Sequence, residues 1–172
     1  MLIVEAMNLF VGTADPSASK HLALQEVKLP PLQRKFQDHS AGGGVVDIEV
    51  GLGIQKLEPS FKLTGHDPQV LSQFGYMGGE TLIYTLRGAT RDKISGKDVA
   101  LKAVIEGELG KAESDAFKNG DLLASDYAIN GVLMYQLFFD DAEKYFFDWR
   151  NSLIRVDGVD RSAKRRAMLG LI

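Results

Sequence analysis

The chain of 172 residues contains no cysteine. Disulfide bridges, thiolate zinc sites and redox catalysis through a thiol are therefore excluded, while a reducing compartment such as a cytosol is permitted. No apolar run reaches the roughly 18 residues that a membrane helix requires. The apolar N-terminus is interrupted at Glu5 and lacks a preceding basic region, so we expect neither a signal peptide nor a membrane anchor.

The sequence is also poor in the residue patterns that support catalysis. Its three histidines, His21, His39 and His66, are scattered, and no two of them share a metal-ligand spacing. His66 and Asp67 could form half of a catalytic triad, but Asp67 is better explained as the N-cap of a helix. A small β-barrel hydrolase or ligand-binding protein that uses His66 is therefore the weaker alternative to a protein without catalytic residues.

Two further motifs resemble binding sites without meeting their requirements. Asp140, Asp141 and Glu143 lack the ligand spacing of a calcium loop, which favours a solvated hairpin turn. The glycine run 42–44 is not followed by the lysine and serine or threonine of a phosphate-binding loop, and a strand follows it instead of a helix. We predict no cofactor and no metal. The net charge of −3 also argues against binding driven by neutralisation of nucleic acid phosphates.

The dominant period along the chain is two, which predicts a mainly β protein. Residues 22–29 read as a strand with a bulge near Gln25 and Glu26. Strict alternation in Val46–Val50 predicts a strand with one face in the core and one wet, charged face. A second strand of like phase runs from Leu57 to Leu63.

The remaining elements are assigned in the same way. Residues 66–74, with Asp67 as N-cap, predict the one short internal helix. Further strands are expected at residues 81–87, 99–108, 122–128, 132–139 and 145–149, with a possible single kinked strand around Asn130 and Gly131, an exposed connection at 109–121 and a terminal helix at 161–171 capped by Asp160. Because no linker divides them, we expect one domain over residues 1–172, a β-sandwich or barrel-like fold in which Tyr145, Phe146, Phe147 and Trp149 belong to the core.

One segment has the pattern of a subunit-contact element. The strand that ends at Val27, Lys28 and Leu29 is closed by Pro30 and Pro31, and the glycine run 42–44 follows a charged crossing. This pattern predicts a projecting arm at about 34–45 that becomes ordered against another copy of the chain.

The C-terminus carries a local positive patch in an otherwise acidic protein. Arg161, Lys164, Arg165 and Arg166 follow Asp160 with no further acidic residue. A solvated last helical turn, or a salt bridge to a neighbouring subunit, is favoured over nucleic acid binding, because charge runs are usually solvated faces.

The order of motifs resembles the major tail tube protein of contractile-tailed bacteriophages and of phage-tail-like bacteriocins. The matching pieces are Asn8-Leu9-Phe10, Leu29-Pro30 with Leu32 and Arg34-Lys35, Ala41-Gly42-Gly43, Gly51-Leu52 with Leu57-Glu58, Leu86-Arg87-Gly88, Val156-Asp157-Gly158-Val159-Asp160-Arg161 and Leu169-Gly170-Leu171. Together they span most of the chain in order.

This resemblance implies a structural subunit and not an enzyme. It implies homohexameric rings stacked into a hollow tube. The tube would either let DNA pass through an acidic lumen without specific binding or puncture a membrane. The implied partners are the tail sheath, baseplate and tape measure proteins, and the implied location is the virion tail, assembled in the bacterial host cytoplasm. A tube protein of a related secretion machine, such as a type VI system, is the alternative. The implied subunit-interface residues are Leu29, Pro30, Arg34, Lys35, Gly42, Gly43, Gly44, Asp157, Gly158, Asp160 and Arg161.

Overall fold

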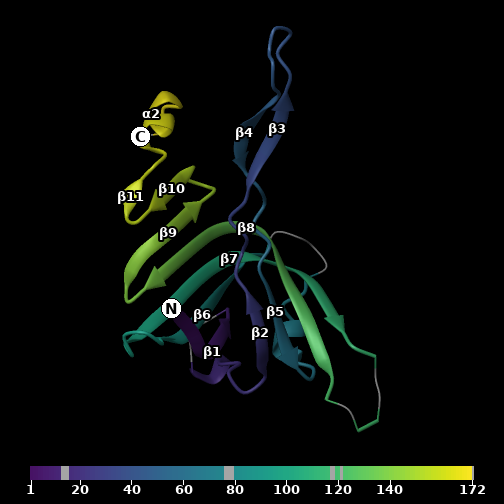
Figure 1. Ribbon diagram of the computed structural model, residues 1–172. Helices are drawn as coiled ribbons and strands as arrows, with labels where there is room; N and C mark the ends of the chain where they lie inside the picture. The colour runs from purple at the N-terminus through teal and green to yellow at the C-terminus, as the bar shows by residue number, and fades with distance from the viewer. Residues whose placement is uncertain (13–15, 76–79, 117–118, 121, 172) are drawn as a thin grey trace.

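A computed structural model describes residues 1–12, 16–75, 80–116, 119–120 and 122–171. Within these residues the chain is mainly β, with two short α-helices, so the predicted fold class is confirmed (Figure 1). The elements are β1 (Leu2–Val11), the 3-10 turn η1 (Pro16–Ala18), β2 (Leu24–Lys28), β3 (Arg34–His39), β4 (Ile48–Ile54), β5 (Ser60–Thr64), α1 (Pro68–Leu71), β6 (Leu82–Asp92), β7 (Asp98–Ser114), β8 (Ala124–Phe139), β9 (Ala142–Asp148), β10 (Leu153–Val156), β11 (Val159–Asp160) and α2 (Ala163–Met168).

A nine-stranded antiparallel sheet forms the body of the molecule. Seven strands follow the order β1-β6-β7-β8-β9-β10-β11, while β5 pairs with β8 and β2 pairs with β5. The first part of β8 pairs with β5 and the last part pairs with β9, so β8 belongs to both halves of the sheet. The remaining strands, β3 and β4, form a separate two-stranded sheet.

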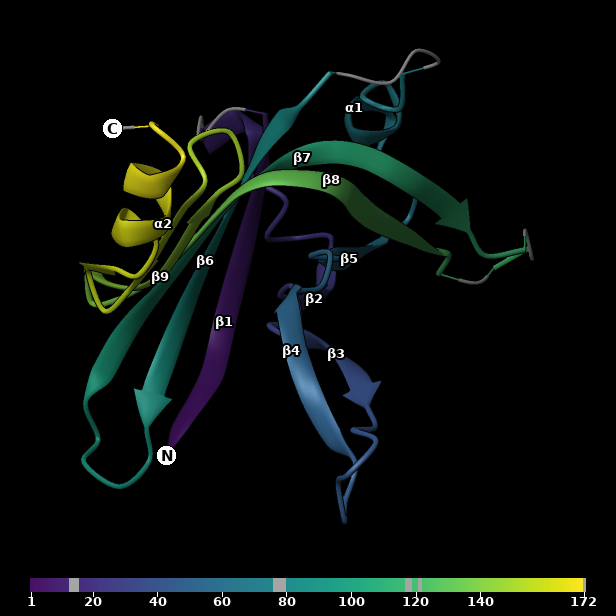
Figure 2. The ribbon, with the colours of Figure 1, turned by 90° about the horizontal axis from the view of Figure 1, so that it is seen from above.

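The long hairpin of β7 and β8 bends between these two halves, and Figure 2 shows both strands arching over β2 and β5. The pairing of β7 with β8 is irregular between Glu106 and Glu108 and between Leu109 and Lys111. Opposite these irregularities Gly131 has a φ of 55°, a conformation that suits glycine. The bulges and this glycine allow one continuous sheet to fold around the core.

The core lies between the two halves of the bent sheet. Phe61 of β5 stacks on Tyr127 of β8 at 4.9 Å between ring centroids, and it also contacts Tyr84 of β6 at 6.1 Å. The other buried members of the cluster are Leu9, Leu57, Leu63, Val70, Leu86, Ala103, Ile105, Leu109, Ile129 and Tyr135. The strand expected at 57–63 starts later, because β5 begins at Ser60, but its apolar residues Leu57, Phe61 and Leu63 lie in the core. The bulge predicted in β2 is confirmed by the register shift between Leu24 and Glu26.

The strand pair β6 and β7 agrees with the predicted hairpin, but β7 is longer than expected. It continues to Ser114, so the prediction of an exposed connection over 109–121 is wrong for its first part. Leu109 is buried, whereas Lys111 and Glu113 form an ion pair on the exposed side of the strand. The charged residues lie on the solvent-exposed face of the strand. From the sequence alone their charge suggests a loop, which explains the wrong prediction. Positions 117, 118 and 121 of the expected connection lie outside the described residues.

The predicted strands at 122–128 and 132–139 are one strand, β8, which bends near Gly131 as the kinked alternative expected. Asp140 and Asp141 turn the chain into β9 with φ values of 47° and 61°. Phe146 is buried in β9, but Trp149 lies beyond its end with 66% of its surface exposed. The prediction that Trp149 belongs to the core is therefore wrong.

The internal helix begins where the sequence predicts. The Asp67 carboxylate accepts hydrogen bonds from the backbone N–H groups of Gln69 and Val70, which confirms its N-cap role, and Pro68 occupies the first turn. Asp67 also forms an ion pair of 2.7 Å with the nearly buried Lys20. Only Val70 of the expected apolar face is buried, since Leu71 is 39% exposed.

Candidate assembly surface: the arm and the C-terminal turn

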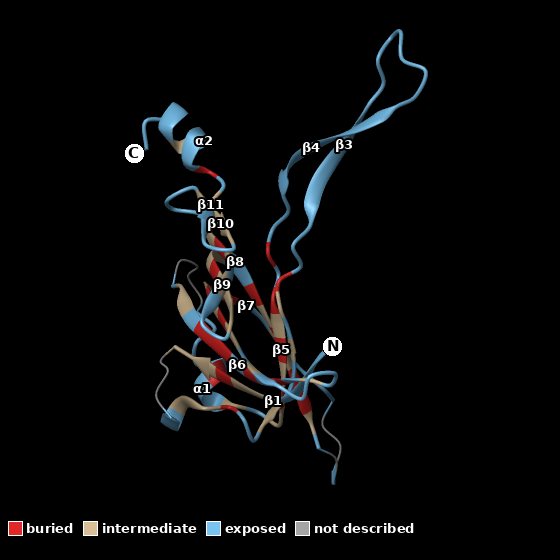
Figure 3. Ribbon diagram, turned by 60° about the vertical axis from the view of Figure 1, so that its left-hand side comes forward, coloured by how far each residue is buried: buried red, intermediate tan, exposed pale blue. Residues whose placement is uncertain are grey.

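The sheet of β3 and β4, which we call the arm hairpin (Arg34–Ile54), rises away from the rest of the molecule (Figure 3). Every residue from 31 to 56 is exposed. The segment at about 34–45 that the sequence assigns to an arm forms the first strand and the tip of this hairpin. The expectation that Val46–Val50 has one face in the core is wrong, because Val46 is 76% and Val50 41% exposed.

The arm hairpin is anchored by apolar residues at both of its roots. Pro30 is buried and Leu29 is half-buried before the first strand, while Leu57 and Pro59 are buried after the second. The backbone carbonyl of Pro59 accepts a hydrogen bond of 2.9 Å from the N–H of Ile129 in β8. Two of the residues expected at an interface, Leu29 and Pro30, are thus part of the anchor that fixes where the arm leaves the core.

The arm has two chemically different faces. In the regular part of β4, Ile48 and Val50 share one face, and they are 58% and 41% exposed. The register shifts between Lys35 and Phe36, and beyond this shift Ile54 lies with Arg34 on the opposite face. On the other face Glu49 is paired directly with Asp38 of β3. Arg34 pairs with Ile54 and Lys35 with Gly53 near the root. An uncovered two-stranded sheet with an apolar face is typical of a surface that binds a partner.

The three glycines at the tip are not required by the backbone of the isolated chain. None of Gly42, Gly43 and Gly44 has a positive φ. A Cβ atom added at Gly42 or Gly43 would contact nothing within 4 Å, and at Gly44 it would lie 3.3 Å from the carbonyl oxygen of Ala41. The glycines therefore supply freedom and small size at the tip and no special turn geometry.

The second group of expected interface residues lies at the C-terminal turn. Asp157 and Gly158 connect β10 to β11 with φ values of 50° and 75°, which makes them a two-residue hairpin turn. The Asp157 carboxylate accepts a hydrogen bond of 2.8 Å from Lys144. Arg161 is exposed, and its backbone N–H donates to the carbonyl of Ile154 at 2.8 Å.

Asp160 holds the terminal helix to this turn. Its carboxylate accepts hydrogen bonds from the N–H and hydroxyl of Ser162 and forms an ion pair of 2.5 Å with Arg166. Partial burial raises the pKa of Asp160, but the hydrogen bonds from Ser162 and the charge of Arg166 outweigh it, so the pKa lies below its usual range. The helix is shorter than predicted, because α2 starts at Ala163 and Ser162 occupies the N-cap position.

The hairpin beneath the turn is stabilised by a bidentate ion pair. Arg155 of β10 donates hydrogen bonds of 2.8 and 2.7 Å to the two carboxylate oxygens of Glu143 in β9, and its guanidinium lies 4.1 Å from the ring centroid of Phe146. The hydrogen bonds from Arg155 lower the pKa of Glu143. The C-terminal turn therefore stands on a fixed base.

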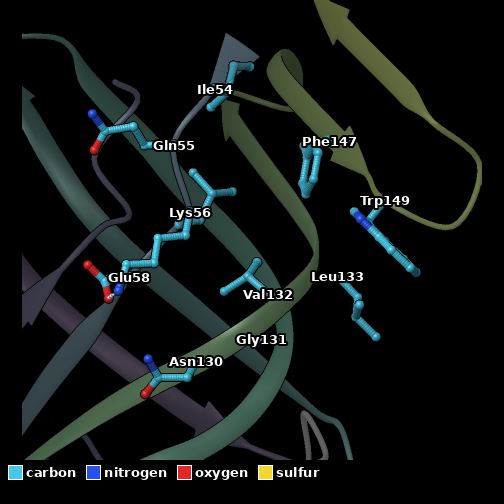
Figure 4. Close-up of a pocket in the computed structure, with 11 residues that line it drawn as sticks. Ile54, Gln55, Lys56, Glu58, Asn130, Gly131, Val132, Leu133, Phe147 and Trp149 are labelled. Carbon is cyan, nitrogen blue, oxygen red and sulfur yellow. Dashed lines mark ion pairs between the residues drawn. The ribbon is translucent and has the colours of Figure 1, made fainter. Parts of the chain in front are cut away.

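A pocket of about 400 Å³ opens at the root of the arm (Figure 4). Residues 54–58 form one wall, residues 130–133 of β8 form another, and Phe147 and the exposed Trp149 complete the lining. Lys56 and Glu58, both in the first wall, form an ion pair of 2.6 Å. In its lining Ile54 is 42% and Trp149 66% exposed, so this pocket adjoins the exposed surface of the arm.

The surroundings of His66 do not form a triad. His66 Nδ1 lies 3.2 Å from the hydroxyl of Ser114, but both oxygens of the Asp67 carboxylate are engaged, one by the helix N-terminus and one by Lys20. No group of three or more histidine and acidic side chains that could hold a metal is present in the described part of the chain. Across the same residues, no helix combines the length and the apolar character needed to cross a membrane.

Comparison with known proteins adds three findings. The family model described as phage tail tube protein FII matches residues 3–170 of this chain. The tail tube protein of Escherichia phage P2 is 25% identical over 171 residues, which cover 98% of this chain and 96% of the relative. A chain in the cryo-EM structure of the sheath/tube terminator of an extracellular contractile injection system (PVC), in the extended state, has a similar fold with a TM-score of 0.53; at 10% identity, the match covers 80% of this chain and 94% of that chain.

Proposed function

The chain belongs to the phage tail tube protein FII family, and we propose that its copies form homohexameric rings that stack into a hollow tube. Its membership makes it a structural protein of the phage tail, which confirms the resemblance read from the sequence motifs and the prediction that it is not an enzyme. The alternative of a hydrolase that uses His66 is thereby set aside.

The observation that carries the proposal is the uncovered arm hairpin. Its strands β3 and β4 have six and seven residues, yet none of these residues is buried in the isolated chain. A two-stranded hairpin is marginally stable by itself in water and gains stability by packing against another surface. A neighbouring copy in the same tube would supply that surface.

The edges of the nine-stranded sheet favour the same assembly. One edge is β1, whose N-terminal residues Leu2, Ile3 and Val4 are 39–54% exposed, and another is the two-residue strand β11. Strand β2, which pairs only with β5 among the described strands, is a third edge. Edges of this kind pair with other chains, and a closed ring of copies leaves no free edge. Ring closure would therefore complete the sheet that each copy leaves open.

The proposed tube has a lumen through which DNA passes without specific binding. Alternatively, the tube punctures a membrane. The surrounding partners in the proposal are the tail sheath, the baseplate and the tape measure proteins. Interface roles are proposed for the arm residues Arg34, Lys35 and Gly42–Gly44 and for Asp157, Gly158, Asp160 and Arg161 at the C-terminal turn. Leu29 and Pro30 act in this scheme by setting the direction of the arm. The tube would be assembled in the bacterial host cytoplasm.

Negative-stain electron microscopy of the purified protein, with its mass in solution measured over a range of concentrations, tests this proposal. We expect rings or hollow tubes with six-fold symmetry, and a mass that rises with concentration toward that of a hexamer. A chain that stays monomeric at every concentration, also when purified baseplate is added as an initiator, would contradict ring and tube assembly.

A further inference from the structure

The carboxylates on the charged face of the arm hairpin have no ion-pair partner among the described residues of their own chain. Asp38 and Glu49 are directly opposite each other on that face, and like charges in such a pair destabilise a sheet. Asp47 immediately precedes the second strand, two positions before Glu49. None of these three carboxylates takes part in an ion pair within the described residues. A cationic partner outside the subunit would remove the repulsion.

Helix α2 has the complementary character. Lys164 and Arg165 are exposed, and neither forms an ion pair within the described chain, whereas Arg166 is engaged by Asp160. The same segment exposes Met168 by 74% and Leu169 by 59%. Its surface thus combines two unpaired cations with uncovered apolar side chains. This matches the charged face of the arm, where Phe36, two positions before Asp38 in β3 and so on the same face, is 52% exposed.

The two surfaces lie where adjacent copies could join them. Figures 1 and 3 show the arm hairpin and α2 at the same end of the molecule, standing apart from each other. No hydrogen bond or ion pair joins the arm strands to α2 among the residues that the structure describes. In a ring, copies that stand side by side in the same orientation would bring the arm of one beside α2 of the next.

We propose that α2 is the docking surface for the arm hairpin of the neighbouring copy in the same ring, with Asp38 and Glu49 facing Lys164 and Arg165. This inference rests on the proposed ring assembly and specifies which surfaces meet in it. Each ion pair at an exposed site is weak, but the contact is repeated around the ring, so its effect on assembly is cooperative. Because the charges are exposed, the contact weakens as salt screens them.

Charge reversal on each side, followed by exchange of the charges, tests this pairing. We expect Glu49→Lys or Arg165→Glu alone to raise the concentration at which half of the protein assembles about tenfold at low salt. The double variant restores assembly to within about threefold of the original chain, because the charges have changed places. Asp98→Lys, an equal charge change at an exposed site in β7, serves as the control and is expected to have no such effect. Single variants that assemble normally, or a double variant that assembles no better than either single variant, would overturn the proposal.

The absence of cysteine allows a direct measurement of proximity. Two long ion-paired side chains hold their Cα atoms further apart than a disulfide spans, so a bifunctional maleimide reagent is applied to the variant carrying Glu49→Cys and Arg165→Cys. We expect a ladder of crosslinked chains that stops at the size of one ring. A ladder without an upper limit would place the contact between rings and overturn the lateral arrangement.

The two proposals fail in different ways. If the original chain forms rings by microscopy but the paired cysteines give no crosslinked product, the docking of the arm on α2 is wrong and ring assembly stands. If the original chain forms neither rings nor tubes, also when purified baseplate is added, both proposals fall.

Discussion

At the scale of single residues, the bend of the main sheet depends on a glycine that local pattern does not reveal. Gly107 lies in β7 where its pairing with β8 becomes irregular. A Cβ atom there would lie 2.8 Å from Cγ2 of Ile129 and 2.9 Å from the backbone oxygen of Asn130. The second contact is with backbone, so relief requires movement of β8 itself.

We therefore expect Gly107→Ala to lower the free energy of unfolding by about 1–3 kcal/mol, the usual effect of overpacking a core. Urea unfolding of the unassembled protein measures it. Gly43→Ala is the matched control, because a Cβ at Gly43 contacts nothing and the backbone has no positive φ there. Equal midpoints for Gly107→Ala and the original chain would show that β8 yields without cost.

The residues that the sequence predicts correctly are those whose partners are close in sequence. Asp67 caps the two N–H groups that follow it within three positions, so the motif alone identifies its role. The burial of Trp149 depends on distant packing, and its prediction was wrong. The cap of α2 depends on the exact start of the helix, and the sequence placed it at Asp160 instead of Ser162. The pair of Asp38 and Glu49 could have been found only by fixing the register of the arm hairpin, since eleven positions separate the two residues.

At the scale of elements, the alternating strand Val46–Val50 shows what period two can and cannot establish. The alternation correctly predicts a strand with two different faces. It does not say what covers the apolar face, and in the described part of the chain Ile48 and Val50 on that face are 58% and 41% exposed. The charges in the second half of β7 led to the opposite error, a strand predicted as a loop. A strand with one solvent-exposed face can carry as many charges as a loop. The strand order around β8 was equally out of reach, because non-local pairing leaves no periodic signal.

The tip of the arm provides the prediction at this scale. Deleting Gly42–Gly44 is expected to leave the unfolding midpoint unchanged, because the tip contains no buried residue and the register from Arg34 to His39 lies outside it. Ring or tube formation is expected to be impaired, since the shortened arm reaches less of its partner. Circular dichroism melts and electron microscopy of the same samples measure the two effects.

A length-matched control separates reach from flexibility. Replacing all three glycines by alanine keeps the length, and the backbone at these positions has no positive φ to be strained. Assembly that survives the alanine replacement and fails on deletion would assign the effect to reach. A normal tube built from the deletion variant would contradict the role of the arm in assembly.

At the scale of the whole molecule, the subunit consists of a packed body and an uncovered hairpin with very different protection from solvent. Strands β5 to β8 enclose the buried cluster, while residues 31–56 are all exposed. Local opening free energies follow burial and contact density, so the two parts differ in stability within one chain. The ordered series of motifs along the chain predicted the family because it samples both parts.

Assembly is therefore expected to act on one part and leave the other unchanged. In hydrogen exchange of the unassembled subunit, amides of β3 and β4 should exchange at least 100-fold faster than those of β7 and β8, because the hairpin opens without disrupting the core. In assembled tubes, exchange in β3 and β4 should slow by a factor of at least 100, since binding to a neighbour must now be broken first. The paired amides of Tyr84 and Ile105 in the body serve as the internal reference, because they are protected in both states. Fast exchange in the arm of assembled tubes would mean that the hairpin stays uncovered there, and that the rings are held together by the edges of the main sheet alone.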